Sequence, residues 1–352
     1  MLSFLLCTAL AMSGLIVPTK QVRAEESQAQ ETSTTTKTIA GLGTSVIVDP
    51  TAPASNTDAW KGSYVYYGNY DAGGDGTAEP VKYRVLDAST TDYSAYGTTQ
   101  TMFLDCDSIL YYTPFDSDNT ANIAGKKASD WSISDVKYSL NGGGFLNKEG
   151  VFTTAEKNAI AKSNVATHAL TTDSKTGINV ASLTQICFVN YVALTEEQIF
   201  LLDAEDVSNG AYGYSMASES CENRKKKTGS SADDWWLRSA GNDNNNIDII
   251  AGYVDGGGIN YSQVINNNPG VSPAFNVKLS SVLFSSVISG TSGETGAEYK
   301  LTLLDADMTI AANSDATRYG KTVTVPYSIS GTNSANATQV SVLVLDKEYT
   351  AG

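Results

Sequence analysis

The chain has 352 residues, of which 41% are hydrophobic, enough for a packed core and, at the usual domain size, two or three domains. Its formal net charge of -15 disfavours nucleic acid and anionic membrane surfaces as partners, because those ligands need clustered Lys and Arg. The one short basic run, residues 224–227, is interpreted as a solvated loop. His168 is the single histidine and no Cys-x-x-Cys pair occurs, which excludes most transition-metal sites and catalysis by two imidazoles.

An apolar run opens the chain at residues 2–18 and is followed by Val22, Arg23 and the small residue Ala24. This pattern predicts a signal peptide, residues 1–24, that is cleaved after Ala24. A membrane anchor is the alternative, but the run is short for a spanning helix of about 20 residues. We therefore expect a secreted or cell-surface protein that is extracellular and has no membrane span after cleavage.

The predicted mature chain keeps three cysteines, Cys106, Cys187 and Cys221. An exported chain that depended on disulfides would carry more cysteines, in an even number. Either one disulfide or a set of free buried thiols fits this count.

Residues 25–57 are rich in Ser, Thr, Ala and Gln, which predicts a flexible linker. Folding is expected to begin near Trp60. Residues 63–67 and 80–86 are β-prone, alternate in polarity and flank a Gly/Asp turn, so they predict a hairpin, with residues 101–104 as a third strand.

Two short helices are predicted next. Ser132 and Asp135 have the spacing of a capping box before apolar residues at helical intervals, and this helix should end at the glycines 142–144. Thr153 and Glu156 repeat the signal. Residues 199–202 form a continuous apolar run, typical of a buried strand, and residues 203–207 are expected to start a short helix. Strands and helices do not alternate regularly, so the predicted class is α+β.

The character of the sequence changes after Leu279. Residues 280–296 are rich in Ser and Gly, and the later runs 299–304, 322–326 and 339–345 read as short strands separated by turns. These signals predict a main domain over residues 58–285, a linker over 286–297 and part of an immunoglobulin-like β-sandwich over 298–352.

Between two apolar ends, residues 233–277 consist mostly of Asn, Asp, Gly, Ser and Tyr. A segment with so few aliphatic side chains cannot hold its shape by burial, so the surrounding framework must impose it. Its polar residues are therefore candidates for display at the surface, and ordinary Asx-rich turns are the alternative.

Several segments resemble, in order, a family of exported bacterial domains of unknown function. The resemblance covers residues 60–284, and its most specific parts are the two motifs Trp235–Ser239 and Gly270–Asn276. The other matching segments are residues 65–70, 83–87, 131–141, 152–156 and 200–202.

That family is similar to the C-type-lectin-like fold of formylglycine-generating enzyme and of variable proteins diversified by retroelements. The resemblance implies small antiparallel sheets, two or three helices and long irregular loops that form a ligand surface. In this family the second motif usually carries Arg where this chain has Ser272, so the internal ion pair that the resemblance implies is in question. The paired late cysteines that the oxidase chemistry requires are missing, because no cysteine follows Cys221.

The candidate ligand-binding residues lie in and beside the polar segment. Amide, carboxylate and phenol groups there can hydrogen-bond hydroxyls and amides of a ligand. No cofactor is expected, although spread carboxylates leave Ca²⁺ open as an alternative. For Trp236 and Arg238, burial in the core and a structural ion pair are the competing interpretations. The set is Trp236, Arg238, Asn242, Asn244, Asn246, Asp248, Tyr253, Asp255, Asn260, Tyr261, Asn266 and Asn268.

These observations favour a secreted or cell-surface binding or adhesion protein that presents its loops to an extracellular glycan or protein. No carboxylates have a recognisable acid–base spacing, so a binding protein is preferred to an enzyme. The alternatives are an envelope-associated hydrolase that uses the loop carboxylates Asp243, Asp248 or Asp255, and a structural surface spacer.

Overall fold

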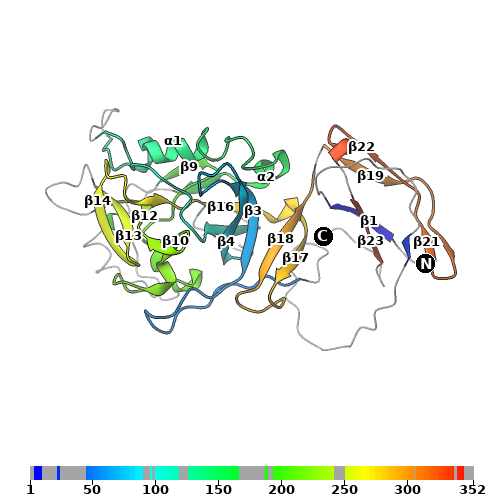
Figure 1. Ribbon diagram of the computed structural model, residues 1–352, viewed down its shortest axis with the longest axis horizontal. Coiled ribbons are helices and arrows are strands. Elements are labelled where there is room, and N and C mark those ends of the chain that lie inside the picture. Colours follow the sequence, from blue (N-terminus) through cyan, green and yellow to red (C-terminus); the bar gives the residue numbers. More distant parts are fainter. Residues whose placement is uncertain are drawn as a thin grey trace. The chain divides into compact units, whose positions relative to one another are not determined.

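A computed structural model describes residues 4–9, 22–23, 45–89, 96, 100–118, 126–165, 187–188, 193–241, 250–305, 307–336 and 339–344. The chain divides into two compact units: unit 1 joins residues 1–36 to 304–352, and unit 2 spans Lys37–Leu303. Both units consist mainly of β-strands, and the helices are few and short (Figure 1). None of the described helices has the length and apolar character needed to span a bilayer.

The first sheet of unit 2 has six strands in the order β16-β5-β4-β3-β18-β17 (Figure 1). All neighbours are antiparallel except β18 and β3, which run parallel. The predicted hairpin and third strand are confirmed as β3, β4 and β5. The strands are β3 (Tyr64–Tyr70), β4 (Glu79–Asp87), β5 (Thr101–Cys106), β16 (Ala274–Lys278), β17 (Val282–Ser289) and β18 (Glu298–Leu303).

The boundaries of unit 2 differ from those that composition predicts. Strand β17 runs through the start of the predicted 286–297 linker, and β18 pairs with β3 instead of opening a separate sandwich. At the other end, Ile47 of the predicted linker is buried in the core, and the Val46 carbonyl accepts a hydrogen bond from the Tyr299 hydroxyl at 2.5 Å. The sequence indicated a strand at β18 but not its pairing with β3, which joins residues far apart in the chain.

The second sheet of unit 2 has the order β14-β13-β12-β15-β6, and β8 also pairs with β12. The two apolar ends of the polar segment meet here, since Trp235 of β12 pairs in parallel with Gly270 of β15. The strands are β6 (Tyr111–Tyr112), β8 (Cys187–Phe188), β12 (Trp235–Gly241), β13 (Ile250–Asp255), β14 (Gly258–Gln263) and β15 (Gly270–Val271). Two small hairpin-like pairs complete the unit, β7 (Ser163–Val165) with β9 (Leu194–Glu197) and β10 (Lys226–Thr228) with β11 (Ser231–Asp233).

Both predicted α-helices are present. Helix α1 (Asp135–Asn141) follows a 3-10 turn, and Ser134, not Ser132, caps it by accepting a hydrogen bond from the Lys137 amide. Helix α2 (Thr154–Ala159) has the predicted capping box of Thr153 with Glu156. The remaining helical segments are 3-10 turns: η1 (Trp131–Ile133), η2 (Asp206–Ser208), η3 (Gly210–Tyr212), η4 (Glu222–Arg224), η5 (Leu279–Ser281) and η6 (Ser334–Asn336).

The apolar run 199–202 is fully buried, as predicted, but it makes only an isolated bridge between Phe200 and Ala274. The Asn141 side chain provides the hydrogen bonds that a neighbouring strand would otherwise supply: its Oδ1 accepts from the Ile199 amide at 3.0 Å and its Nδ2 donates to the Ile199 carbonyl at 2.8 Å. Burial was therefore readable from the sequence, whereas the backbone pairing was not.

Unit 1 contains three small sheets, β1 with β23, β19 with β22, and β2-β21-β20. The predicted strands near residues 322 and 339 are confirmed as β21 and β23. Strands β1 and β2 lie in the predicted leader, and cleavage after Ala24 stays a prediction. The strands are β1 (Phe4–Ala9), β2 (Val22–Arg23), β19 (Thr309–Ala312), β20 (Thr317–Tyr319), β21 (Thr322–Thr324), β22 (Tyr327–Ser330) and β23 (Gln339–Val344).

Candidate ligand-binding surface

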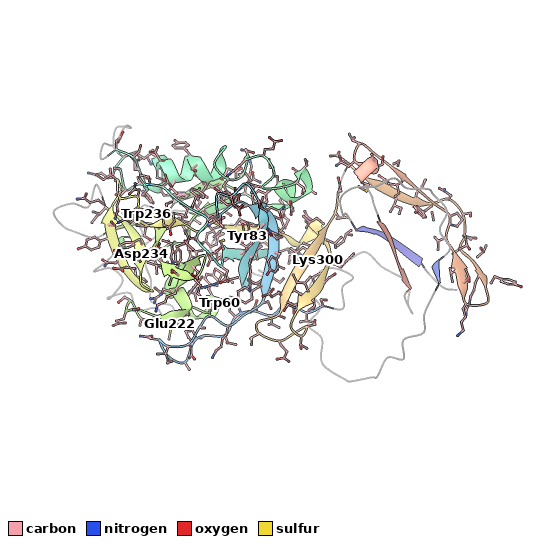
Figure 2. All side chains as sticks on the ribbon, in the orientation of Figure 1. Trp60, Tyr83, Glu222, Asp234, Trp236 and Lys300 are labelled. Carbon is pink, nitrogen blue, oxygen red and sulfur yellow. The ribbon has the colours of Figure 1, made fainter. Side chains whose placement is uncertain are left out.

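Trp236 is a core residue and offers no platform for a ligand. Its side chain is 0% exposed, and its indole N–H donates to the Thr113 carbonyl at 2.9 Å. Trp235, on the opposite face of β12, is equally buried and donates to the Arg224 carbonyl at 3.1 Å. Figure 2 shows Trp236 within the part of unit 2 that contains β12, β13 and β14. Both tryptophans therefore stabilise the unit. For Trp236, burial in the core was the interpretation that competed with ligand binding.

Arg238 is also buried, at 1% exposure, and forms an internal ion-pair network. Its guanidinium lies 2.5 Å from Asp203 Oδ2 and 3.1 Å from Asp206 Oδ2. The Tyr96 hydroxyl donates to the same Asp206 oxygen at 2.5 Å. Burial, followed by the nearby charge of Asp203, raises the pKa of Asp206 to about 7. The structural ion pair is thus the role that the structure gives Arg238.

Four candidates, Asn242, Asn244, Asn246 and Asp248, lie outside the described residues, as do Asp243 and His168. The remaining six flank that segment on strands β13 and β14 and in the turn that follows. They are Tyr253, Asp255, Asn260, Tyr261, Asn266 and Asn268.

The β13–β14 hairpin brings Tyr253, Asp255 and Asn260 together at its outer surface. Asp255 Oδ2 accepts from the Tyr253 hydroxyl and from Asn260 Nδ2, both at 3.2 Å. Asp255 and Asn260 are exposed and Tyr253 is half-buried. Tyr261, one residue further along β14, is 36% exposed. The hairpin therefore displays a carboxylate, an amide and two phenols, which can bind donors and apolar groups of a ligand.

Asn266 and Asn268 shape the turn after β14. The Asn266 side chain donates to Ser262 Oγ at 2.9 Å and accepts from the Asn268 amide at 3.0 Å. This is an Asx-type arrangement, in which a side chain holds its own turn. Asn268 itself is exposed. These contacts support a structural role for Asn266, which stabilises the turn.

Two further carboxylates, which the sequence did not single out as site residues, adjoin the hairpin. Asp233 Oδ2 accepts from the Tyr112 hydroxyl at 2.6 Å, and Asp234 Oδ1 accepts from the Gly256 amide at 3.1 Å. Burial raises the pKa of Asp234, and the charge of Asp255 adds to this effect. We call Asp233, Asp234 and Asp255, with Tyr112, Tyr253, Asn260 and Tyr261, the hairpin surface.

The turn of the hairpin is anchored to the segment 218–221. The Ser220 hydroxyl donates to the Gly256 carbonyl at 2.6 Å, and the Cys221 amide donates to the Gly257 carbonyl at 3.1 Å. Gly257 has φ +91°, and a Cβ atom there would lie 2.3 Å from the Cys221 carbonyl oxygen, so only glycine fits this contact.

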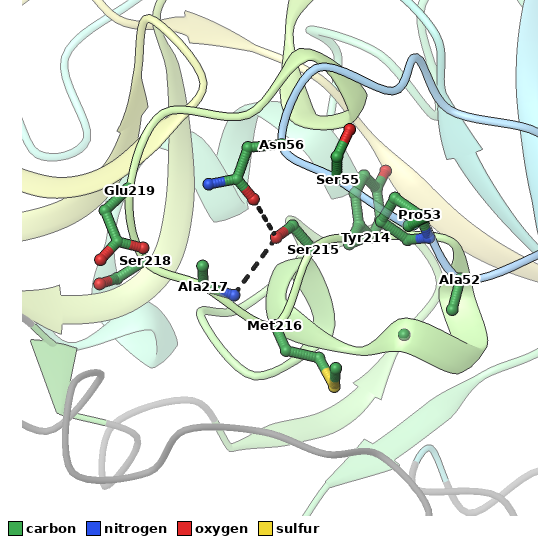
Figure 3. Close-up of a pocket in the computed structure, with 12 residues that line it drawn as sticks. Ala52, Pro53, Ser55, Asn56, Tyr214, Ser215, Met216, Ala217, Ser218 and Glu219 are labelled. Carbon is green, nitrogen blue, oxygen red and sulfur yellow. Dashed lines mark hydrogen bonds between the residues drawn. The ribbon is translucent and has the colours of Figure 1, made fainter.

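A pocket of about 390 Å³ adjoins this segment and lies between residues 52–56 and 210–219 (Figure 3). This volume lies in the lower part of the range of about 300–1,000 Å³ that is usual for small-ligand pockets. Ser215 Oγ donates to Asn56 Oδ1 at 3.0 Å and accepts from the Ala217 amide at 3.3 Å, which joins the two walls. Figure 3 places Glu219 at one end of the pocket and Ala52 at the other. We call this cavity the 215–219 pocket.

Arg224 holds the pocket and the hairpin turn together. It is fully buried, and its five N–H groups all donate to backbone carbonyls, at 2.7–3.0 Å for four of the five contacts. Burial lowers the pKa of Arg224, against the opposing effect of nearby acidic groups that include Glu219. The carbonyls belong to Val207, Ser215, Ala217, Glu219 and Gly257.

The interpretation of residues 224–227 as a solvated loop was therefore wrong for two of its members. Lys226 is 0% exposed as well, and its ammonium lies 2.6 Å from Asp105 Oδ1 and 2.8 Å from Ser272 Oγ. The side chains alternate because residues 226–228 form strand β10, which sends every second side chain inward. Lys226 thus supplies an internal cation beside Ser272, where the family resemblance implies Arg.

Two sets of acids in unit 2 differ in their partners. Asp105, Asp203 and Asp206, which are buried, and the half-buried Asp107 each lie against Lys or Arg. Among the described residues, Asp233, Asp234, Asp255 and Glu219 form no ion pair. The hairpin surface and the adjoining pocket rim therefore carry carboxylates that form no ion pair with the described residues.

The described part of the chain contains no group of three or more His, Cys, Asp or Glu side chains arranged to hold a metal ion. Cys106 and Cys221 are buried free thiols, and the Cys187 side chain lies outside the described residues. Burial raises the pKa of Cys106 to about 12, so its thiol is protonated at neutral pH.

These features define a mostly-β domain with a polar hairpin and an adjoining pocket. Residues 100–279, just over half of the chain, match the DUF6273 family, described as a domain of unknown function. The chain therefore belongs to the DUF6273 family. No curated protein and no solved structure matches it.

Proposed function

We propose that this protein is an exported binding protein whose unit 2 engages a basic segment of a partner protein across the hairpin surface. The observation that carries the proposal is the contrast between the two groups of acids. Asp233, Asp234 and Asp255 form no ion pair with the described residues, while the buried acids Asp105, Asp203 and Asp206 of the same unit each lie against Lys or Arg.

Electrostatics and composition both support a protein ligand. Opposite charge on two surfaces accelerates their encounter and disfavours wrong partners. Tyrosine is enriched at protein interfaces, and Tyr112, Tyr253 and Tyr261 lie among these acids, with Tyr112 42% exposed. A neutral glycan gains less from an uncompensated negative surface, and the tryptophan on which a sugar would stack is buried.

Rigidity supports recognition by this surface. The hairpin turn is fixed by hydrogen bonds to Asp234, Ser220 and Arg224, so few side chains have to be ordered when a partner binds. The surface is thereby pre-organised, as the proposed role requires.

Export and the finer fold assignment are part of the same proposal. The apolar run before Ala24 supports export to the cell surface or medium. The pairing of Trp235 with Gly270 joins the two motifs of the family resemblance in one sheet, which supports a C-type-lectin-like fold for unit 2. The short strands of unit 1 support an immunoglobulin-like module there.

The test is a binding array of peptides and glycans probed with the labelled full chain. We expect hits among Lys- and Arg-rich peptides, and weaker binding as salt rises from about 0.1 M to about 1 M, where the screening length falls from about 10 Å to about 3 Å. The variant D234N/D255N keeps acceptor oxygens for the Gly256, Tyr253 and Asn260 hydrogen bonds but removes two charges, and it should bind more weakly.

The control is Asp75→Asn, which neutralises an exposed acid that also accepts a local hydrogen bond, from the Thr77 amide, in the β3–β4 turn. It should bind like the wild-type chain. Hits confined to glycans, or equal binding by D234N/D255N and the wild type, would contradict the proposal.

A further inference from the structure

We propose that the 215–219 pocket receives one basic side chain, lysine or arginine, of the partner protein, with Glu219 as its counter-ion. This inference rests on the proposed function and names the chemical group that the pocket beside the hairpin surface recognises. It follows from three properties of the pocket: its charge, its apolar wall and its rigid frame.

Glu219 is the one charged residue that lines the pocket. It is exposed, and it forms no ion pair with the described residues. The nearby cations are occupied: Arg224 by carbonyls, and Lys61 and Lys225 each by an acid of its own turn. An incoming cation therefore meets a carboxylate that forms no ion pair, and the Asn56 side-chain oxygen, which also belongs to the lining, accepts from Ser215 and has a second lone pair.

The rest of the lining suits an aliphatic stem. Met216 is 44% exposed, and its unbranched thioether adapts to the shape of a bound chain. Lysine and arginine bury their methylene stems along apolar surface while the charged end stays at a polar group. The other apolar lining groups are the side chains of Ala52, Pro53, Ala54 and Ala217.

Arg224 makes this arrangement rigid. By binding the carbonyls of Ser215, Ala217 and Glu219, it turns these carbonyl groups toward the interior of the unit. The backbone that carries Met216 and Glu219 is thus fixed before a ligand arrives. A pocket that is already fixed loses less conformational entropy when a ligand binds.

The experiment uses the full chain labelled with ¹³C at the methionine methyl groups. Met216 lies in the pocket, and Met102, 1% exposed in the core, is an internal reference. The probes are Nα-acetyl-lysine amide, Nα-acetyl-arginine amide and the uncharged Nα-acetyl-norleucine amide. The variant Met216→Leu assigns the signal. We expect a saturable shift of the Met216 methyl with the first two probes, none with norleucine, and no shift of Met102.

Glu219→Gln should weaken binding of the charged probes by about tenfold or more, because it removes the counter-ion from a partly enclosed site. Glu149→Gln, which neutralises an exposed acid after helix α1, is the matched control and should titrate like the wild type. An unshifted Met102 signal in Glu219→Gln establishes that this variant is folded.

Equal shifts with norleucine, an unchanged titration of Glu219→Gln, or no response of Met216 to either charged probe would overturn the inference. The two proposals fail separately. If D234N/D255N loses peptide binding while Met216 does not respond, the pocket assignment fails and the proposed function stands. If Met216 responds but the array yields no basic peptides, the proposed function fails.

Discussion

The guanidinium of Arg224 lies 2.9 Å from the carbonyl oxygen of Gly257, so one buried side chain ties the floor of the pocket to the turn of the β13–β14 hairpin. The two halves of the candidate surface therefore share a support. A change at Arg224 should alter both halves at once, although its side chain is hidden from any ligand.

Arg224→Lys should destabilise unit 2 by roughly 2–4 kcal/mol, because an ammonium has three donors and leaves at least two buried carbonyls unpaired. All four tryptophans lie in unit 2, so fluorescence during urea unfolding reports the free energy of unfolding of this unit. The control Lys225→Met removes a partly exposed pair with Glu222 and should cost less than about 1 kcal/mol. Equal effects of the two substitutions would refute the role of Arg224.

The buried pair of Lys226 and Asp105 should show strong energetic coupling. Lys226→Met alone leaves a buried carboxylate without its cation and should lower the free energy of unfolding by about 3–5 kcal/mol. Adding Asp105→Asn removes the unpaired charge, so the double variant should be more stable than the sum of the single effects predicts. A double-mutant cycle by urea unfolding measures this, and additive effects would count against the pair.

Ser272→Arg introduces the residue that the motif resemblance implies at this position. In the wild-type background it would place a second cation beside Lys226 in a fully buried site, and it should destabilise unit 2 strongly. Combined with Lys226→Met, the new guanidinium replaces the lost cation near Asp105, and part of the stability should return. Thermal unfolding of the three variants tests this order; a double variant less stable than both single variants would contradict it.

Asp206 should make the stability of unit 2 fall as pH rises from about 4 to about 7. Its pKa is about 7 in the folded chain, against an ordinary value of 3.8, so the folded state holds a proton that the unfolded state releases. Asp203, Arg238 and Tyr96 surround the Asp206 carboxyl group and, with its burial, determine its pKa. Asp206→Asn should flatten the pH dependence relative to the wild type in urea unfolding at several pH values. The same slope in both proteins would exclude Asp206 as its source.

Cys106 and Cys221 should resist alkylation in the folded chain. Both thiols are buried, and the raised pKa of Cys106 leaves little thiolate at pH 8. After treatment with iodoacetamide, peptide mass spectrometry should find these two cysteines unmodified, and modified once urea is added. Rapid modification of Cys106 without urea would show that the β5 region opens readily.

Local sequence determined several of the central strands and the capped helix. Thr153 and Glu156 cap α2 because they act on backbone groups within one turn, and the alternation in residues 80–86 sets the two faces of β4. The apolar character of residues 199–202 and of Trp235 likewise announced burial. The sequence also singled out Tyr253, Asp255 and Asn260, but as part of irregular loops, whereas they lie on the paired strands β13 and β14.

Tertiary structure alone decided the remainder, because it depends on residues distant in the chain. From the sequence, Arg224 and Lys226 were predicted to be solvent-exposed cations. In the structure, Asp105 pairs with Lys226 and carbonyl groups of other segments surround Arg224. The pocket needs residues 52–56 to meet 210–219, and β18 joins unit 2 only because it pairs with β3. Local patterns report burial and turn chemistry, whereas long-range contacts determine which charges are neutralised and which remain available to a partner.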